Sequence, residues 1–390
     1  MKFLRTFDWL AFLTTLALVA IGTTAIRSAG GARAEAVFHG MWISNLTTAG
    51  FGLVLYFLLA FLDYRKLLLL TAVPAYVVSL LLLVAVLLFG AEQFGGRRWL
   101  WFFQPSEVSK LCVISLTALL FGGGFSRIDA VRAKFGGFLL GAAVVGVPAL
   151  LILAEPDLGT TLTLVPAVVV MMLAAGVWRR WMVTFLAVGG IGVLALLGAV
   201  YEAERPGVPA ERKERILRYV PLKPHQLNRV KVFLFPEQDQ LGAGYNLRQA
   251  KISIGSGGFS GKGIGKGESN HLKYLPQAIS MNDFIFCVYA EETGFVGSSV
   301  LLALFGVLLV SGCRTAFLST DGCGRLLAIG FSTLLFAHVY VNIAMSIGVV
   351  PITGLPLPFI SSGRTFLIVA LCGLGLIQSV NIHREEKGKC

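Results

Sequence analysis

The chain has 390 residues, of which 56% are hydrophobic and only 14% charged, and its mean hydropathy is +0.77. Soluble domains carry about 25% charged residues, so the composition excludes a set of soluble domains and indicates a protein that crosses a membrane several times. The net charge of +12 would suit nucleic-acid binding, but in a membrane protein it indicates basic cytoplasmic loops and affinity for anionic lipid, so we expect no nucleic-acid partner.

Ten apolar stretches are long enough, or nearly so, to cross about 30 Å of hydrocarbon as helices. They lie at 9–26, 42–62, 67–90, 107–124, 136–154, 161–177, 182–200, 283–311, 326–347 and 365–382. All exceed the roughly 9–11 residues of a transmembrane strand. We therefore predict an all-α polytopic membrane protein with a single domain over 1–390. Its fold is a bundle of ten transmembrane helices with one long extracytoplasmic loop at about 201–281.

The distribution of basic residues predicts the orientation of the bundle. Lysine and arginine gather in the segments on the side of the N-terminus, for example at Arg65, Lys66, Arg179 and Arg314, and are sparser in the opposite short loops. Short cytoplasmic loops carry such an excess, so we expect both termini in the cytoplasm. The loop 201–281 then lies outside, and its own basic residues do not contradict this because long loops translocate regardless of charge.

The loop 201–281 contains motifs of its own. Residues 211–220 predict a short amphipathic helix stopped by Pro221 and Pro224. Within 246–267, Leu247, Ile252 and Ile254 form an apolar face that suits the bilayer surface. Seven glycines at 255–267, interspersed with lysines, could bring backbone N–H groups to a phosphate. A tight turn explains these glycines equally well, and a solvated connector is the alternative for the whole loop.

Ionisable residues within or beside the spans are functional candidates, because charges are costly in hydrocarbon. Glu107 and Lys110 share one helix face, either as functional groups or as a structural ion pair. Glu155 and Asp157 lie in a kink between two spans, where Asp157 could cap the next helix or take part in catalysis.

Three further groups of residues lie in the C-terminal spans. We expect Asp283 to begin a helix, Glu291 or Glu292 to pair with a basic group, and His338 and Asn342 to form interhelical hydrogen bonds. The segment 350–364 contains three prolines and cannot be helical throughout. Irregular backbone at membrane depth is tolerated against protein or a wet cavity, so we expect this segment to line a cavity on the outer side.

Six short motifs occur in one order along the chain: RWL with FQPSEVSK at 98–110, EPDLGT at 155–160, DQLGAGY at 239–245, IGSGG at 254–258, DFIF with EE at 283–292, and PLPFISSG at 356–363. In this the chain resembles the shape, elongation, division and sporulation family, and its elongation branch more than its division or sporulation branches. Gln240 and Arg364 depart from the family pattern. The resemblance covers nearly the whole chain.

The resemblance implies a peptidoglycan glycosyltransferase of the bacterial cytoplasmic membrane that polymerises lipid II at the outer face, for elongation and rod shape. Its implied partners are a class B penicillin-binding protein, which is a transpeptidase, and other membrane proteins of the elongation complex. A lipid-linked precursor transporter, a non-enzymatic scaffold and a division or sporulation enzyme remain alternatives. Repeated halves would favour a transporter, and we find no convincing internal repeat.

Glycan polymerisation needs a base for the sugar hydroxyl and cations for the departing diphosphate. The resemblance assigns the base to Asp239. Between Pro224 and the glycines the loop has only two carboxylates, Asp239 and Glu237, so Glu237 is the reserve, and an Asx turn before Gly242 is the structural alternative for Asp239. The candidates for substrate binding are Arg98, Glu107, Lys110, Arg229, Lys251, Lys262 and Ser362. No acidic cluster demands a metal, so we expect no certain cofactor and leave a divalent cation, Mg²⁺ or Mn²⁺, open.

Overall fold

The computed structural model describes residues 6–31, 40–93, 96–100, 103–123, 135–177, 179–205, 207–268 and 276–384. Eight of the helices in these residues are long and apolar enough to cross a membrane: α2 (Trp9–Ala29), α4 (Met41–Phe61), α5 (Tyr64–Phe89), α8 (Phe135–Ala154), α10 (Arg179–Glu204), α16 (Ile285–Leu318), α17 (Gly322–Ser346) and α18 (Arg364–His383). Two shorter helices, α6 (Pro105–Phe121) and α9 (Leu158–Ala174), coincide with the other two predicted spans. The all-α fold class is confirmed, although eight helices rather than ten reach full spanning length.

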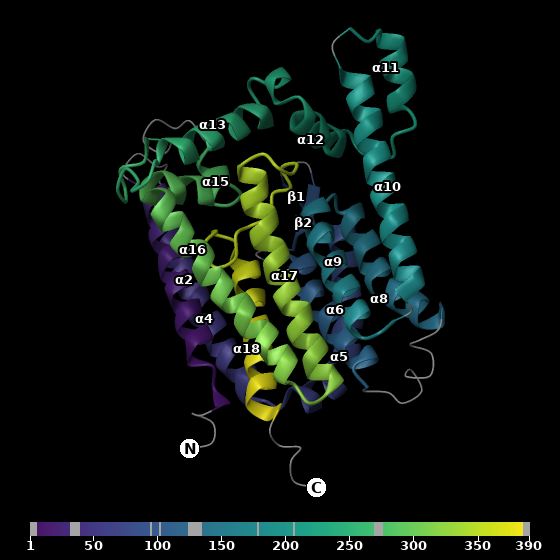
Figure 1. Ribbon diagram of the computed structural model, residues 1–390, viewed down its shortest axis with the longest axis vertical. Helices are drawn as coiled ribbons and strands as arrows, with labels where there is room; N and C mark the ends of the chain where they lie inside the picture. The colour runs from purple at the N-terminus through teal and green to yellow at the C-terminus, as the bar shows by residue number, and fades with distance from the viewer. Residues whose placement is uncertain are drawn as a thin grey trace.

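These helices stand side by side as one bundle (Figure 1). The first residues of α2 and the last of α18 lie at one end. The remaining elements gather at the opposite end: the hairpin of β1 (Ala91–Gln93) and β2 (Gly96–Trp99), and α11 (Ala210–Leu217), α12 (Pro224–Leu234), η1 (Pro236–Gln238), α13 (Ala243–Ser256) and α15 (Gln277–Ser280). The predicted long loop is therefore a helical layer that covers one end of the bundle.

Aspartates begin several of the spans. The carboxylates of Asp8, Asp63, Asp157 and Asp321 accept hydrogen bonds from backbone N–H groups in the first turns of α2, α5, α9 and α17. Such caps satisfy donors that a helix leaves unpaired at its N-terminus. The prediction that Asp157 caps a helix is confirmed.

The helix α16 is interrupted at Gly294, where φ is 67°. The glycine-rich segment after α13 supplies partners for the backbone groups freed there. The N–H groups of Lys262 and Gly263 donate to the carbonyls of Glu291 and Glu292 at 3.0 and 2.9 Å, and Phe295 donates to the carbonyl of Gly258 at 2.9 Å. Unpaired backbone groups are costly at membrane depth, so these hydrogen bonds stabilise the break in the span. They also fix the helical layer to the bundle.

The short helix predicted at 211–220 is present as α11, which ends at Leu217 before Pro221. Pro224, expected only to end a helix, is also the first residue of α12, where a missing N–H and a fixed φ are tolerated.

The apolar face predicted within 246–267 is wrong in part. Leu247 does not face lipid: it is 2% exposed and lies beside Gly348 at the end of α17, while Ile254 packs against the core. Only Ile252 of the predicted surface face is exposed.

Candidate active site

Two arginines from different elements act on each other electrostatically at the end of the bundle that the helical layer covers. Arg98, on β2, donates from its guanidinium to the carbonyl of Pro156, and Arg229, on α12, donates from Nη1 to the carbonyl of Thr353 at 2.8 Å. Burial, and after it the positive charge of Arg98, lowers the pKa of Arg229. Among the described residues both guanidinium groups bond to backbone carbonyls rather than to a carboxylate. The pair therefore keeps its positive charge available for an anion.

Asp283 is an acidic residue on which both arginines act electrostatically. It follows α15 and precedes α16, and its Oδ2 lies near Gly354 together with the guanidinium of Arg229. Burial raises its pKa to about 6, and the charges of Arg229 and Arg98 oppose that rise. The sequence predicted only that Asp283 begins a helix. Its place beside the arginines could not be predicted, because they come from distant segments of the chain.

A second charged group lies deeper, where α6 meets α17 and α18. Lys110 is 0% exposed; its Nζ lies 2.7 Å from Oε2 of Glu107 and 2.9 Å from Nε2 of His338. The ring of Phe366 stacks on His338 with centroids 4.1 Å apart and lies 5.0 Å from the ammonium of Lys110. The predicted ion pair is present, and the structure adds a histidine that spacing along the chain could not assign to it.

The segment between α17 and α18 is irregular and mostly buried, as its prolines predict. Asn342 donates to the carbonyls of Asp283 and Leu355 at 3.0 and 2.7 Å. The hydroxyl of Ser362 donates to Oδ1 of Asn282 at 2.5 Å. Ser362 therefore secures this segment to the residues before α16, and its role in substrate binding stays a prediction.

Asp239 lies between η1 and α13, half-buried. Its Oδ1 accepts a hydrogen bond from the N–H of Gly242 at 2.8 Å, and its Oδ2 accepts one from the N–H of Gly244 at 3.1 Å. This is the capping turn anticipated as the structural alternative. Each oxygen keeps a second lone pair, so the turn also fixes a carboxylate that can accept a proton. Glu237, the reserve base, is instead exposed and pairs with Arg248 at 2.9 Å.

The two lysines of the glycine-rich region differ in their surroundings. Lys262 Nζ lies 2.9 Å from Oε1 of Glu291 and 3.5 Å from Oε2 of Glu268, and the bond to Glu291 is the main cause that raises its pKa. Lys251 is exposed and crosses Gly348. The structure thus places Lys262 in an internal ion pair away from the arginines, so its contact with substrate stays a prediction, as does that of Lys251.

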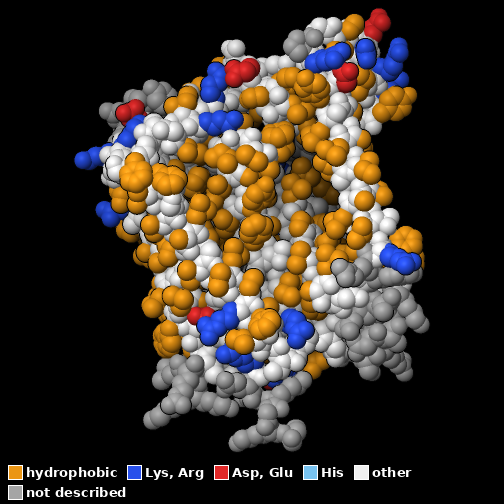
Figure 2. All heavy atoms as spheres, viewed as in Figure 1, with side chains coloured by type: hydrophobic (Ala, Val, Ile, Leu, Met, Phe, Trp, Pro, Cys, Tyr) orange, Lys and Arg blue, Asp and Glu red, His pale blue; other side chains and the backbone are white. Residues whose placement is uncertain are grey.

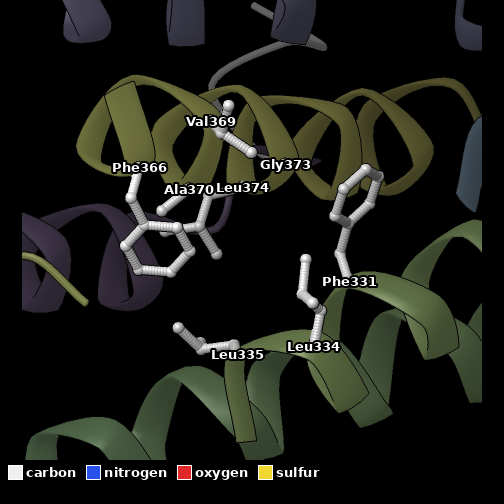
Figure 3. A pocket seen from close by; sticks show the side chains of 8 residues that line it. All are labelled: Phe331, Leu334, Leu335, Phe366, Val369, Ala370, Gly373 and Leu374. Atoms are coloured by element: carbon white, nitrogen blue, oxygen red, sulfur yellow. The ribbon is translucent and has the colours of Figure 1, made fainter. Parts of the chain in front are cut away.

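The bundle also contains an apolar cavity between α17 and α18 (Figure 3). Phe331 and Leu334 point into it from α17, and Phe366 and Leu374 from α18. It offers no polar group for chemistry. Across the described part of the chain, no three His, Cys, Asp or Glu side chains lie close enough to hold a metal ion, and the prediction of a divalent cation stays untested.

The model of the family described as Cell cycle protein (FtsW, RodA and SpoVE) matches residues 8–387. The chain belongs to this family. It is 37% identical over 319 residues to the peptidoglycan glycosyltransferase MrdB of Escherichia coli K12, covering 80% of this chain and 78% of that protein. It is 33% identical over 390 residues to a probable peptidoglycan glycosyltransferase FtsW of Trichlorobacter lovleyi, covering 97% and 94%.

Solved structures of the family share the fold. A chain from a structure described as "Structural coordination of polymerization and crosslinking by a peptidoglycan synthase complex" matches with a TM-score of 0.74 and 31% identity, covering 97% of this chain and 99% of that one. The Rod shape determining protein RodA of Thermus thermophilus matches with a TM-score of 0.65 and 29% identity, covering 97% and 98%. The family resemblance read from the motifs is thus confirmed over the whole bundle.

Proposed function

We propose that the protein is a peptidoglycan glycosyltransferase that polymerises lipid II for cell elongation. Family membership supports the reaction class, because the relative MrdB is named a peptidoglycan glycosyltransferase and the relative FtsW a probable one. The observation that carries the proposal is the arginine pair: Arg98 and Arg229 act on each other, and within the described residues their guanidinium groups bond to backbone carbonyls and form no salt bridge with a carboxylate. A departing diphosphate carries two or more negative charges, so it matches the positive charge of the two arginines.

The proposed reaction transfers a sugar from polyprenyl diphosphate to a 4-hydroxyl group. Asp239 takes the hydroxyl proton, the freed oxygen bonds to the anomeric carbon, and the bond from that carbon to the diphosphate oxygen breaks. The electron pair leaves with the diphosphate, which Arg98 and Arg229 stabilise. Glu107 and Lys110 are 3% and 0% exposed, and we assign them a supporting role beneath the site.

The test of this mechanism is glycan synthesis by the purified protein and its partner supplied with lipid II. Asp239→Asn keeps acceptors for the N–H groups of Gly242 and Gly244 but removes the base, so we expect at least a 100-fold loss of rate, within the range typical of a general base. Glu237→Gln serves as the control and should change the rate little. A well-folded Asp239→Asn protein with near-normal synthesis would disprove the base, and lipid movement without polymerisation would favour a transporter.

The partner we propose is a class B penicillin-binding protein, together with other membrane proteins of the elongation complex. A structural relative comes from a complex that coordinates polymerisation and crosslinking, which supports a crosslinking partner. Co-purification of this chain with a transpeptidase anchored by one membrane helix tests the assignment. Failure of the two proteins to associate in membranes of the native bacterium would refute it.

We also propose that the helical outer layer faces away from the cytoplasm and that both termini face it. The first residues of α2 and the last of α18 share one end of the bundle, opposite α12 and α13 (Figure 1). Reporter fusions at Glu268 and Cys390 should give opposite sides of a bacterial cytoplasmic membrane. The same side for both would refute this topology.

A further inference from the structure

The carboxyl group of Glu155 is buried within the influence of Arg98 and has no hydrogen-bond partner among the residues that the structure describes. Glu155 is 0% exposed, and neither of its oxygens meets a donor among the described residues. Buried polar atoms in native proteins are nearly always satisfied, so such a group calls for an explanation in function. The mechanism above makes no use of it.

Asp157, two residues further on, has the opposite surroundings. Its carboxylate accepts hydrogen bonds from Nε2 of Gln104 at 2.9 Å and from the N–H and hydroxyl of Thr160 at 3.1 and 2.8 Å. The donors near this kink are therefore directed at Asp157. The positive charge that acts on Glu155 comes from Arg98.

Arg98 acts on Glu155 through its charge, but within the described residues the two side chains form no hydrogen bond. Arg98 donates to the carbonyl of Pro156, the residue that follows Glu155, while its Nε is buried and meets no partner in the described part of the chain. A carboxylate next to a guanidinium normally forms a charge-assisted, often bidentate pair. Because no such pair forms here, the charge of Arg98 is not neutralised by Glu155 and remains available to the site.

The charges around Glu155 explain this separation. Burial, and then the charge of Asp157, raises the pKa of Glu155 to about 9, against the opposing effect of Arg98. At neutral pH the group is thus an uncharged acid. Arg229 and Asp283 act on the same site from α12 and from the start of α16, and the ammonium of Lys223 reaches the carbonyl of Ala154 at 3.4 Å.

We propose that Glu155 is a positioning residue, which supports Arg98 from behind and leaves the charge of its guanidinium free for the diphosphate of the substrate. The inference rests on the anion site proposed above. If Glu155 ionised, it would draw Arg98 into an internal ion pair and weaken that site. The anion site should therefore lose affinity as the pH rises through the range in which Glu155 ionises.

The experiment measures binding of inorganic pyrophosphate to the purified full-length protein by calorimetry, at about pH 7.5 and about pH 9.5, on either side of the titration of Glu155. The proteins compared are the wild type, Glu155→Gln, and Glu214→Gln as a control at an exposed glutamate of α11. Pyrophosphate's own titration is common to all three. Between the lower and the higher pH, the wild type and the control should lose roughly tenfold more affinity than Glu155→Gln. A tenfold change corresponds to about one hydrogen bond to a charged group.

Each outcome decides the matter. Equal pH dependence in the wild type and Glu155→Gln overturns the role of Glu155, and so does loss of binding by Glu155→Gln at about pH 7.5. Absence of binding by the wild type at both values removes the anion site itself. If Glu155→Gln does not fold, infrared spectra of the wild type should contain a protonated carboxyl band that fades near pH 9, the pKa of Glu155; its absence overturns the inference.

Discussion

The helices α18 and α10 are both apolar enough to cross a membrane, yet their surroundings differ sharply. In α18, 78% of the most apolar stretch is buried within the protein, against 6% in α10. The helix α18 packs against α4, α17 and α6, whereas α10 stands at the edge (Figure 1) with the surface hollowed between it and the bundle (Figure 2). Apolar residues in one helix serve protein packing and in the other serve lipid contact.

The two helices use glycine differently. A Cβ added at Gly375 of α18 would lie 2.7 Å from the carbonyl oxygen of Tyr56, so only glycine permits this approach of α4. A Cβ added at Gly190 of α10 would meet nothing within 4 Å. The same residue type thus marks close helix packing in α18 and an open face in α10.

Their polar contacts differ as well. Phe366 of α18 covers the buried pair of Lys110 and Glu107. The helix α10 is held at its ends: Trp181 contacts Phe135 at 4.8 Å between ring centroids, and Glu204 pairs with Lys213 and Lys231 at 2.7 and 2.6 Å. The pair beside α18 is sealed from solvent, whereas the lysines that hold α10 are partly exposed.

The largest expected effect comes from breaking the sealed pair. Lys110→Ala leaves the carboxyl of Glu107 buried without its cation, which should lower the free energy of unfolding by about 3–5 kcal/mol. Thermal unfolding in detergent measures this. The double variant Lys110→Met with Glu107→Gln should recover most of the loss, and a double variant as unstable as Lys110→Ala would contradict this account.

Substituting the contact glycine should have a smaller effect. Gly375→Val forces α18 away from α4 and should cost about 1–3 kcal/mol by overpacking. The matched variant Gly190→Val on α10 should leave the unfolding temperature nearly unchanged. Equal destabilisation by the two substitutions would mean that α10 packs as closely as α18.

The smallest effect is expected at the end of α10. Glu204→Ala removes the carboxylate between α11 and α12, and because both lysines are partly exposed the loss should be about 1 kcal/mol or less. Spin labels on α10 and α12 should report a broader spread of distances. Glu202→Ala, which breaks only an exposed pair with Arg205, is the control and should leave the distances unchanged.

The sequence by itself determined the membrane class, the order of the helices and the motifs that identify the family. These properties follow from runs of apolar residues and from local signals such as Asp157 before α9, which act over a few neighbouring positions. The sequence did not predict the interruption of α16 at Gly294 or the start of α12 at Pro224. A glycine in a span and a proline in a loop are each compatible with several local structures.

Only the tertiary structure decided which charges meet. Arg98 and Arg229 are far apart along the chain, and hydrogen bonds to different backbone carbonyls hold them at one site. His338 reaches Lys110 from another helix. It also distinguished α18 from α10, which hydropathy does not separate. The physical reason is that burial, pairing and the protonation of a group such as Glu155 depend on what surrounds it in space, and the neighbours that matter come from distant segments.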